Sequence, residues 1–395
     1  MIVGVGETPV GNLQGSDVIE LHVQAAKAAM ADAGIAKNEI DGLLTGGSFV
    51  FDNIRHHMVI GEHLGLHCKT LTDTLRTGGA APAYALQLAK WAVETGQCQA
   101  VLFVAADVLY SGAGAGNGAT SYVESGAHSL EFEAPFGVHI PGYYALAAAR
   151  HMHEFGTTSE QLAAIAVACR KHASMNPAAQ KQTPITIEDV LGSRMISSPL
   201  RLLDCSLNSD GGAAYIVTTL ERARDLKARP IRMLGLGQAQ SYYHMGHLAK
   251  AVGRPADEAG RFSLTRTVQS VAAAQAFGEA GVAPADVDVA QIYDSFTITA
   301  LLQFEDLGFC AKGEGGAYVE GGRIELGGEL PVNTHGGLLS YAHSGVPGGM
   351  YHIIEAVRQL RGECGPRQVP DAEVALATSV SAVASNHSIC ILGRD

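Results

Sequence analysis

The chain has 395 residues, a net charge of −12, 47% hydrophobic residues and 17% charged residues. This length is enough for two units that each bury a core, and the negative charge argues against nucleic acid as a partner. The seven cysteines are widely spaced and form no C-x-x-C pair, which favours a reduced, cytoplasmic protein over a disulfide scaffold. No apolar run approaches about 18 residues and no basic leader precedes the first apolar stretch, so we expect neither a membrane span nor a secretory signal.

Strands and helices are predicted to alternate over the first hundred residues. Strands are expected at the apolar runs 2–5, 40–44, 70–75 and 100–106. Asp17 and Glu20 have the spacing of a capping box, and a helix is predicted from there to Gly34. Another helix is predicted to follow Gly78 and Gly79 and to end at Gly96. The alternation favours an α/β sheet with right-handed crossovers.

The segment from 107 to about 226 interrupts this alternation and is interpreted as an inserted cap. Helices are predicted over 146–155 and, after a capping box at Thr158 and Gln161, through Cys169. The cap concentrates basic residues in an otherwise acidic chain, a pattern that suits phosphates or other anionic ligands. These residues are Arg150, Arg170, Lys171, Lys181, Arg194 and Arg201.

An internal repeat indicates that the fold is duplicated. Residues 29–41 match residues 276–288 at a constant offset, with five of thirteen positions identical. Gly78-Gly79 and Gly348-Gly349 each precede a predicted helix and then a buried strand. The sequence therefore predicts two similar α/β halves, residues 1–250 with the cap inserted at about 108–226, and residues 251–395.

Three loops are expected to meet where strands of the two halves end. They are 75–79, 293–297 and 333–349. The last contains His343 and opens a helix, so it combines a base that titrates near neutral pH with free backbone N–H groups. This combination is typical of a site that removes a proton beside a developing oxyanion.

These blocks resemble those of the thiolase superfamily, particularly the branch related to sterol-carrier thiolases. The resembling stretches are Asn333-Thr-His-Gly-Gly337 with Ala342-His343-Ser344, Tyr293-Asp-Ser-Phe296, Leu75-Arg-Thr-Gly-Gly-Ala-Ala81 and Pro199-Leu-Arg-Leu-Leu-Asp-Cys-Ser206. The resemblance covers nearly the whole chain. It implies a thiolase fold, with two duplicated α/β halves in five layers (αβαβα), and a substrate bound as an acyl-CoA thioester.

Two departures from the thiolase pattern bear on the reaction. Leu75 stands where thiolases carry the nucleophilic Cys at the start of a buried helix, and a leucine cannot attack a thioester. The block that matches the second thiolase Cys, residues 378–385, contains neither Cys nor Gly. Cys205 and Cys310 are the nearest candidates for a displaced thiol.

Some thiolase-fold aldolases that shorten steroid side chains also lack the two thiolase cysteines and carry a Tyr at the position of Tyr293. This chain differs from them in keeping His343.

The resemblance implies catalytic roles for His343, Tyr293 and Asn333, with His343 or Tyr293 as the base and Asn333 supporting the enolate oxygen or the loop around it. It implies a substrate-binding role for Leu75, Arg76, Thr77, Gly78, Gly337, Tyr341 and Ser344. For Tyr341, packing is favoured over a second hydroxyl in the site, and His335 is interpreted as a turn residue. No metal site and no cofactor are expected, apart from the coenzyme A of the substrate.

The leading hypothesis is retro-aldol cleavage of a 3-hydroxyacyl-CoA, because that reaction needs one base and donors for an enolate oxygen but no acyl-enzyme. An acyltransferase of the acetyl-CoA acetyltransferase type that uses a displaced Cys is the second hypothesis. A non-catalytic acyl-CoA-binding subunit of a complex is the third, and a ketosynthase is the fourth. The resemblance implies a homodimer and, from the aldolases, a small zinc-ribbon/OB-fold partner.

Overall fold

The computed structural model describes residues 1–51, 53–66, 70–112, 139–241 and 263–394. Its nine-stranded sheet has the order β3-β2-β4-β7-β1-β8-β11-β10-β9. The strands are β1 (Ile2–Glu7), β2 (Gly42–Gly46), β3 (Leu71–Leu75), β4 (Ala100–Val108), β7 (Asp210–Thr218), β8 (Ile231–Gln240), β9 (Val289–Gln291), β10 (Val374–Ser381) and β11 (Asn386–Arg394). β1 and β8 are joined by one pair, Ile2 with Ile231, so the sheet consists of two parts that meet at this pair.

The two parts of the sheet repeat one topology. In the first part, β2 and β4 are parallel, β4 and β7 are antiparallel, and β7 and β1 are antiparallel. In the second part, β9 and β10, β10 and β11, and β11 and β8 have the same relations in the same order. Val332, bridged in parallel to Ala290, takes the place that β3 has beside β2. The duplication predicted from the sequence is therefore present in the sheet.

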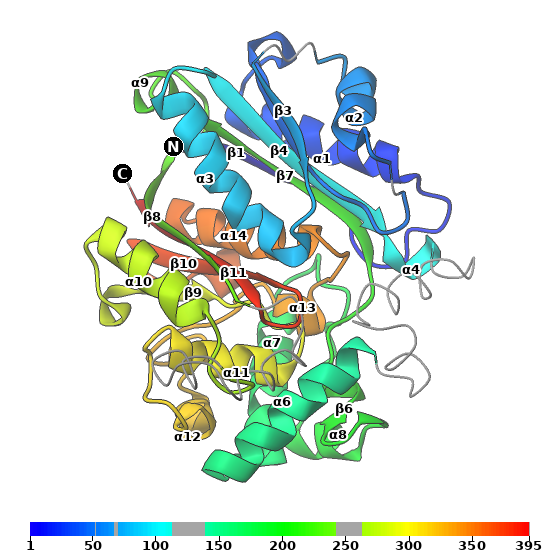
Figure 1. Cartoon of the computed structure of the whole chain (residues 1–395), viewed down its shortest axis with the longest axis vertical. Helices are drawn as coiled ribbons and strands as arrows, with labels where there is room; N and C mark the ends of the chain where they lie inside the picture. Colours follow the sequence, from blue (N-terminus) through cyan, green and yellow to red (C-terminus); the bar gives the residue numbers. More distant parts are fainter. Residues whose placement is uncertain (52, 67–69, 113–138, 242–262, 395) are drawn as a thin grey trace, which may run out of the picture.

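Helices complete five layers, as the resemblance implied. The helices that cover the sheets are α1 (Val18–Ala33), α2 (His56–Leu64), α3 (Ala81–Glu94), α10 (Gln269–Ala280) and α14 (Pro347–Arg361). α3 and α14 lie against each other between the two parts of the sheet and contact strands of both, while α1 and α10 cover the outer faces (Figure 1). The N-terminal ends of the two central helices thus lie between the two halves.

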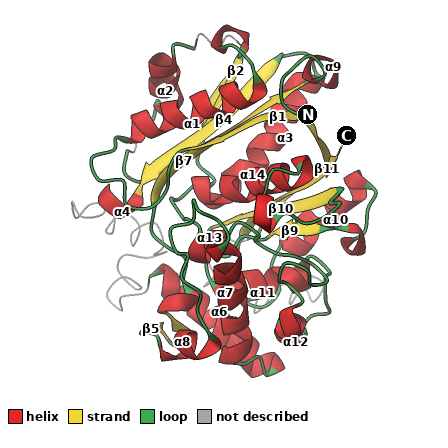
Figure 2. Cartoon of the chain, turned by 180° about the vertical axis from the view of Figure 1, so that it is seen from behind, coloured by secondary structure: helices red, strands yellow, loops and turns green. Residues whose placement is uncertain are grey.

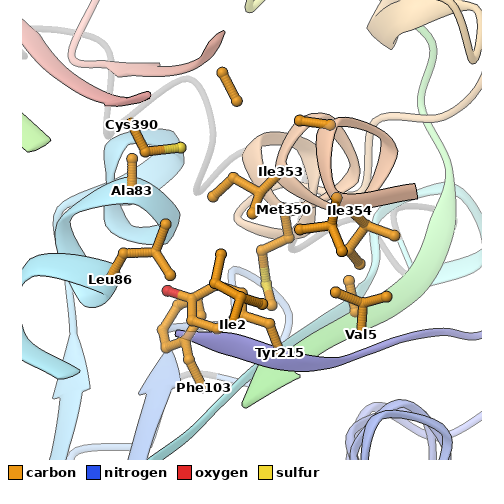
Figure 3. Packing of buried hydrophobic residues seen from close by; sticks show 14 of the residues in the cluster. Ile2, Val5, Ala83, Leu86, Phe103, Tyr215, Met350, Ile353, Ile354 and Cys390 are labelled. Atoms are coloured by element: carbon orange, nitrogen blue, oxygen red, sulfur yellow. The ribbon is translucent and has the colours of Figure 1, made fainter. Parts of the chain in front are cut away.

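The core between the halves forms around these central helices. Met350, Ile353 and Ile354 of α14 face Ile2 and Tyr215 of the first half (Figure 3). Tyr215 is fully buried, and its hydroxyl donates a hydrogen bond to the carbonyl of Pro82 at the start of α3, 2.6 Å away. Such contacts hold both helix starts in fixed positions, and burying each large aliphatic side chain contributes roughly 1.5–3 kcal/mol.

The helix ends that could be read from the sequence are mostly confirmed. The Asp17 side chain accepts hydrogen bonds from the N–H groups of Ile19 and Glu20, and α1 ends before Gly34, whose φ is +71°. Thr158 and Gln161 form the predicted capping box of α7. The helix predicted over 146–155 begins earlier, because Ile140 and Pro141 provide an acceptable first turn.

The cap is described in part. Figure 2 shows its helices α6 (Ile140–Phe155) and α7 (Ser159–Ser174) at one end of the molecule, below the short helix α13 (Gly337–Ser340) and beside α11 (Thr297–Asp306). The cap also contains α8 (Ile187–Gly192), β5 (Met195–Ser197) and β6 (Leu200–Arg201). Other short helices among the described residues are α4 (Leu109–Gly112), α9 (Leu220–Ala223) and α12 (Gly315–Tyr318).

The limits predicted for the insertion differ from the structure at its end. Residues 210–218 form β7, which lies between β4 and β1 in the sheet, so the part of the chain outside the sheet ends before Asp210 rather than near 226. This strand is buried along its whole length, as expected of a strand in the middle of a sheet covered on both faces. Residues 113–138 of the cap and the predicted boundary at 250 lie outside the described residues.

Candidate active site

The three loops predicted to meet do so around the ring of Tyr293. A Cβ atom on Gly79 would lie 2.5 Å from the Tyr293 hydroxyl oxygen and 2.3 Å from the carbonyl oxygen of Val380. On the other side, a Cβ atom on Gly348 would lie 2.8 Å from Cδ2 of His343. Both glycines are therefore required by close approach, since no side chain fits between these loops.

Tyr293 and His343 form a buried hydrogen-bonded pair. The Tyr293 hydroxyl lies 3.1 Å from Nε2 of His343, and the rings are nearly perpendicular, at 82°. The two residues are only 5% and 6% exposed. Tyr293 lies two residues after the end of β9 at Gln291, and its N–H donates to Oγ1 of Thr378 at 2.9 Å. The sequence prediction that these two residues share one site is consistent with this geometry.

Backbone contacts fix His343 from the cap side. Its N–H donates to Oγ of Ser209 at 3.0 Å, and its carbonyl accepts from the N–H of Ser209 at the same distance. Burial lowers the pKa of His343 to about 4, although a backbone hydrogen bond at Leu207 acts in the opposite direction. The imidazole is therefore neutral near pH 7, with one nitrogen that accepts a proton. A phenol hydrogen-bonded to a neutral imidazole is a general acid–base unit.

Asn333 has a supporting role in this geometry. Its Oδ1 accepts from the N–H of Ile292 at 2.7 Å, and its Nδ2 donates to the carbonyl of Ile292 at 2.8 Å. Its φ is +52°, a conformation that Asn tolerates better than most residues. The amide thus ties the 333–349 loop to the residue before Tyr293. Of the two roles expected for Asn333, the structure supports holding the loop and does not place the amide on the Tyr293–His343 pair.

The remaining loop residues make contacts away from the pair. The Tyr341 hydroxyl donates to Oε1 of Glu7 at 3.0 Å, and Oγ of Ser344 lies 2.7 Å from the Tyr351 hydroxyl. Both are buried, so a substrate-binding role for these two hydroxyls is not supported, and packing is the better description of Tyr341. Gly337, at φ +63°, lies against Asp294: a Cβ atom there would be 2.1 Å from Oδ2 of the carboxyl.

The block from Leu75 to Gly78 lies on the opposite side of Tyr293. Leu75 is buried in the core, with 6% exposure, so the position that a thiolase nucleophile occupies holds an inert side chain. Arg76 is exposed and donates to the carbonyl of Asn53 at 3.2 Å. Thr77 precedes a turn of 3-10 helix that leads into α3. Gly78, at φ +58°, approaches Ser381 of β10.

Two site residues were not predicted. Asp294 accepts from the N–H groups of Leu338 and Leu339 at 2.7 and 3.3 Å, and burial raises the pKa of its carboxyl to about 7. His352 is fully buried in α14, with its ring centroid 5.9 Å from that of Tyr293. Asp294 could have been found from its place beside Tyr293 in the motif. His352 had no comparable signal, because it lies one turn inside a helix whose pattern is otherwise that of a core element.

The candidate displaced thiols are in poor environments for a nucleophile. Burial raises the pKa of both Cys205 and Cys310 to about 12, so both thiols are protonated near pH 7. Cys169 lies nearer the site, with Sγ 3.5 Å from Oδ2 of Asp294, but burial and that carboxyl raise its pKa well above the usual value. Among the described cysteines, none has its thiol pKa lowered.

The described part of the chain contains no helix with both the length and the apolar character needed to cross a membrane.

Comparisons with known proteins identify the family of this chain. Residues 257–394 match the family described as thiolase C-terminal domain-like. A steroid side-chain-cleaving aldolase of Thermomonospora curvata is 37% identical over all of this chain and 97% of its own length. A 17-hydroxy-3-oxo-4-pregnene-20-carboxyl-CoA lyase of Mycobacterium tuberculosis is 38% identical over 91% of each chain. The solved Ltp2-ChsH2(DUF35) aldolase superposes with a TM-score of 0.83 at 35% identity, covering all of this chain and 97% of the other.

The chain belongs to the thiolase superfamily, on the sterol-carrier-type branch that includes thiolase-fold aldolases.

Proposed function

We propose that this protein cleaves a 3-hydroxyacyl-CoA by a retro-aldol reaction, without a covalent acyl-enzyme. The observation that carries the proposal is the buried Tyr293–His343 pair, with a 3.1 Å hydrogen bond, opposite a loop in which Leu75 replaces a nucleophile. The names of the relatives, an aldolase and a CoA lyase, support the same reaction class.

The pair supplies the base for this reaction. Neutral His343 accepts a proton from Tyr293 as the Tyr293 oxygen takes the proton of the substrate's β-hydroxyl. The Cα–Cβ bond then breaks, which releases a ketone or aldehyde and leaves the electron pair on an acyl-CoA enolate. The pair returns the proton to Cα, so one base serves both steps and the overall reaction neither consumes nor releases a proton.

The start of α14 is the element that we assign to the enolate oxygen. It begins at Pro347 and carries Gly348 and Gly349 in its first turn, directly beside His343. Pro347 has no N–H group and the N–H of Gly348 donates to the carbonyl of Gly345 at 3.0 Å, so the assignment relies on the positive end of the helix dipole, which favours a negative oxygen. We propose no cofactor and no metal for this chemistry, apart from the coenzyme A of the substrate.

A small partner subunit is part of the proposal. The solved aldolase that superposes on this chain is named with a DUF35 protein, and we infer a small zinc-ribbon/OB-fold partner for this chain as well. We also propose a homodimer of this chain as the core of the assembly, in the cytoplasm.

The test is a mass-resolved incubation with panels of acyl-CoA and 3-hydroxyacyl-CoA thioesters, with and without the co-purified partner. The proposal expects a ketone or aldehyde together with a shortened acyl-CoA, and an unmodified protein mass. A stable acyl adduct on any Cys would contradict the proposal and identify the protein as an acyltransferase. Binding without turnover would support a non-catalytic acyl-CoA subunit.

A further inference from the structure

A short segment at the end of the cap joins the two loops that carry the catalytic pair. Residues 206–209 directly precede β7. At one end of the segment, the N–H of Ser206 donates to the carbonyl of Ser295 at 2.9 Å, two residues after Tyr293. At the other end, the last residue of the segment binds the main chain of His343. The segment therefore connects the two loops and helps to fix their separation.

Ser209 holds the main chain of His343 through two hydrogen bonds. Its Oγ accepts from the N–H of His343, and its own N–H donates to the carbonyl of His343, both at 3.0 Å. The imidazole of His343 also has a hydrogen bond with the backbone of Leu207, in the same segment. Ser209 is fully buried, so removal of its hydroxyl would leave the buried N–H of His343 without this acceptor.

Gln180 fixes the direction of the Ser209 hydroxyl. The hydroxyl donates to Oε1 of Gln180 at 2.5 Å, and Nε2 of Gln180 donates to the carbonyl of Asn208 at 3.3 Å. The N–H of Gln180 donates to the carbonyl of Tyr341 at 3.0 Å, which holds this residue against the same loop. A hydroxyl has one hydrogen and two lone pairs. Because the hydrogen is directed at Gln180, a lone pair of Oγ remains for the N–H of His343.

The segment is anchored to a central strand of the sheet. Asp210 is the first residue of β7, which lies between β4 and β1, and it exchanges two backbone hydrogen bonds with Gly11, at 2.7 and 3.0 Å. Its carboxyl accepts from three further backbone N–H groups, those of Leu13, Tyr110 and Ser111. Ser209 is therefore next to a residue with a fixed position, and His343 of the second half is held from the first half.

We propose that Ser209 is a positioning residue for the catalytic base, and that it sets the position of His343 relative to Tyr293 while Gln180 holds its hydroxyl in place. The proposal rests on the proposed function of the Tyr293–His343 pair. Ser209 acts through the main chain of His343 and takes no part in the proton transfer. Proton transfer requires donor and acceptor within hydrogen-bond reach, and a misplacement of about 1 Å can cost roughly a hundredfold in rate.

Ser193 provides a matched control in the same cap. Its Oγ donates to the carbonyl of Val190 at 2.7 Å and accepts from the N–H of Leu203 at 3.4 Å. It thus has the same pattern as Ser209, with one donated O–H and one accepted N–H. Both partners belong to the cap and not to the loops of Tyr293 and His343.

The experiment begins with kcat and KM for cleavage of a 3-hydroxyacyl-CoA by the enzyme in complex with its partner. We expect Ser209→Ala to lower kcat at least about tenfold and to keep KM within about threefold, because the pair is misaligned while substrate binding is retained. Gln180→Met removes the acceptor at similar side-chain length and is expected to lower kcat by about three- to tenfold. Ser193→Ala is expected to leave both constants unchanged.

A double-mutant cycle separates positioning from a general loss of structure. In Tyr293→Phe the phenolic hydroxyl is gone, so there is no proton transfer between Tyr293 and His343 to align. Adding Ser209→Ala to Tyr293→Phe is therefore expected to change the residual kcat by less than about threefold. A merely structural role would lower kcat by the same factor in both backgrounds.

Histidine NMR provides a readout that needs no turnover. The protein is labelled with isotope-enriched histidine, and the ring signals of His343 are identified by their loss in His343→Gln. We expect these signals to shift in Ser209→Ala and in Gln180→Met and to stay in place in Ser193→Ala.

Each outcome decides something. An unchanged kcat in Ser209→Ala, equal losses in the two backgrounds, or unshifted His343 signals would overturn the positioning role and leave the proposed function intact. A wild type that cleaves nothing in the substrate panel overturns the proposed function, and the His343 signals still decide whether Ser209 positions this residue. If Ser209→Ala unfolds below the assay temperature, Gln180→Met, at a half-buried position, is taken through the same cycle.

Discussion

The hydroxyl of Tyr293 occupies the space that a side chain on Gly79 would need, 2.5 Å from the position of its Cβ atom. Gly79 lies in the 3-10 turn that leads into α3, whereas Tyr293 follows a strand of the other half of the fold. The hydroxyl that we propose as the reactive group therefore reaches the candidate site from the second half, and Gly79 of the first half leaves space for it. The proposed use of this phenol in place of a thiol underlies the first two predictions.

Tyr293→Phe is expected to lower kcat for cleavage by a factor of about 10² to 10⁴, the usual contribution of a positioned acid–base group. The fold is expected to survive, because only one oxygen is removed and the ring stays in its cluster with Leu338 and Val380. The measurement is steady-state kinetics together with thermal unfolding.

Tyr341→Phe is the matched control for this variant. It also removes a buried phenolic hydroxyl, but that hydroxyl contacts Glu7 and not His343. We expect a loss of about 1–3 kcal/mol in unfolding free energy, because the Glu7 carboxylate loses a buried partner, with kcat within about threefold of the wild type. If Tyr341→Phe reduced kcat as much as Tyr293→Phe, the assignment of the base would be wrong.

Gly79→Ala is expected to reduce both stability and activity. The added Cβ would lie 2.3 Å from the backbone oxygen of Val380 and 2.5 Å from the Tyr293 hydroxyl, so the Tyr293–His343 hydrogen bond must lengthen or the strand must move. We expect at least a hundredfold lower kcat/KM and a loss of about 1–3 kcal/mol.

Gly278→Ala provides the contrast to Gly79→Ala. A Cβ on Gly278 meets nothing within 4 Å, and the residue lies inside α10. It is expected to raise the unfolding free energy by up to about 1 kcal/mol, because alanine favours the helix. Equal losses in the two variants, measured by denaturant unfolding, would contradict the close-packing argument.

The pH dependence follows from burial of His343. Its folded-state pKa is about 4, below the unfolded value near 6.5, so the unfolded chain binds more protons between these values. The stability linked to His343 is therefore complete above pH 6.5 and is lost as the pH falls towards 4, by an amount on the order of 3 kcal/mol. The rate of cleavage should accordingly fall at low pH as His343 becomes protonated, with an apparent pKa nearer 4 than 6.5.

The comparison that isolates this contribution is His343→Gln against the wild type. The unfolding free energy of the wild type minus that of the variant should decrease as the pH falls from 8 to 4, because glutamine has no proton to gain. A difference that stays constant or increases as the pH falls would show that burial does not lower the pKa of His343.

The sequence predicted the meeting of Tyr293 and His343 because both follow strand ends in a duplicated topology, and strand ends of such halves converge. It did not predict where Asn333 and Tyr341 point. Those directions depend on the left-handed backbone of Asn333 and on side chains from distant segments, Ile292 and Glu7. His352 was not found for a related reason, since a helical pattern identifies a buried face but not which buried residue lacks a partner.

The remaining prediction concerns the cysteines. Cys205→Ser and Cys310→Ser, alone or together, are expected to retain kcat within about threefold, because burial keeps both thiols protonated and neither is among the contacts of the Tyr293–His343 pair. Iodoacetamide should leave cleavage intact under the conditions in which the protein stays folded.

Cys169→Ala tests the thiol nearest the site. Its Sγ donates to Asp294, so we expect this variant to lose about 1–3 kcal/mol of unfolding free energy. In every cysteine variant, incubation with acyl-CoA is expected to leave the protein mass unchanged. A burst of free CoA that disappears in any one of these variants would identify a nucleophilic Cys and reject the reaction without an acyl-enzyme.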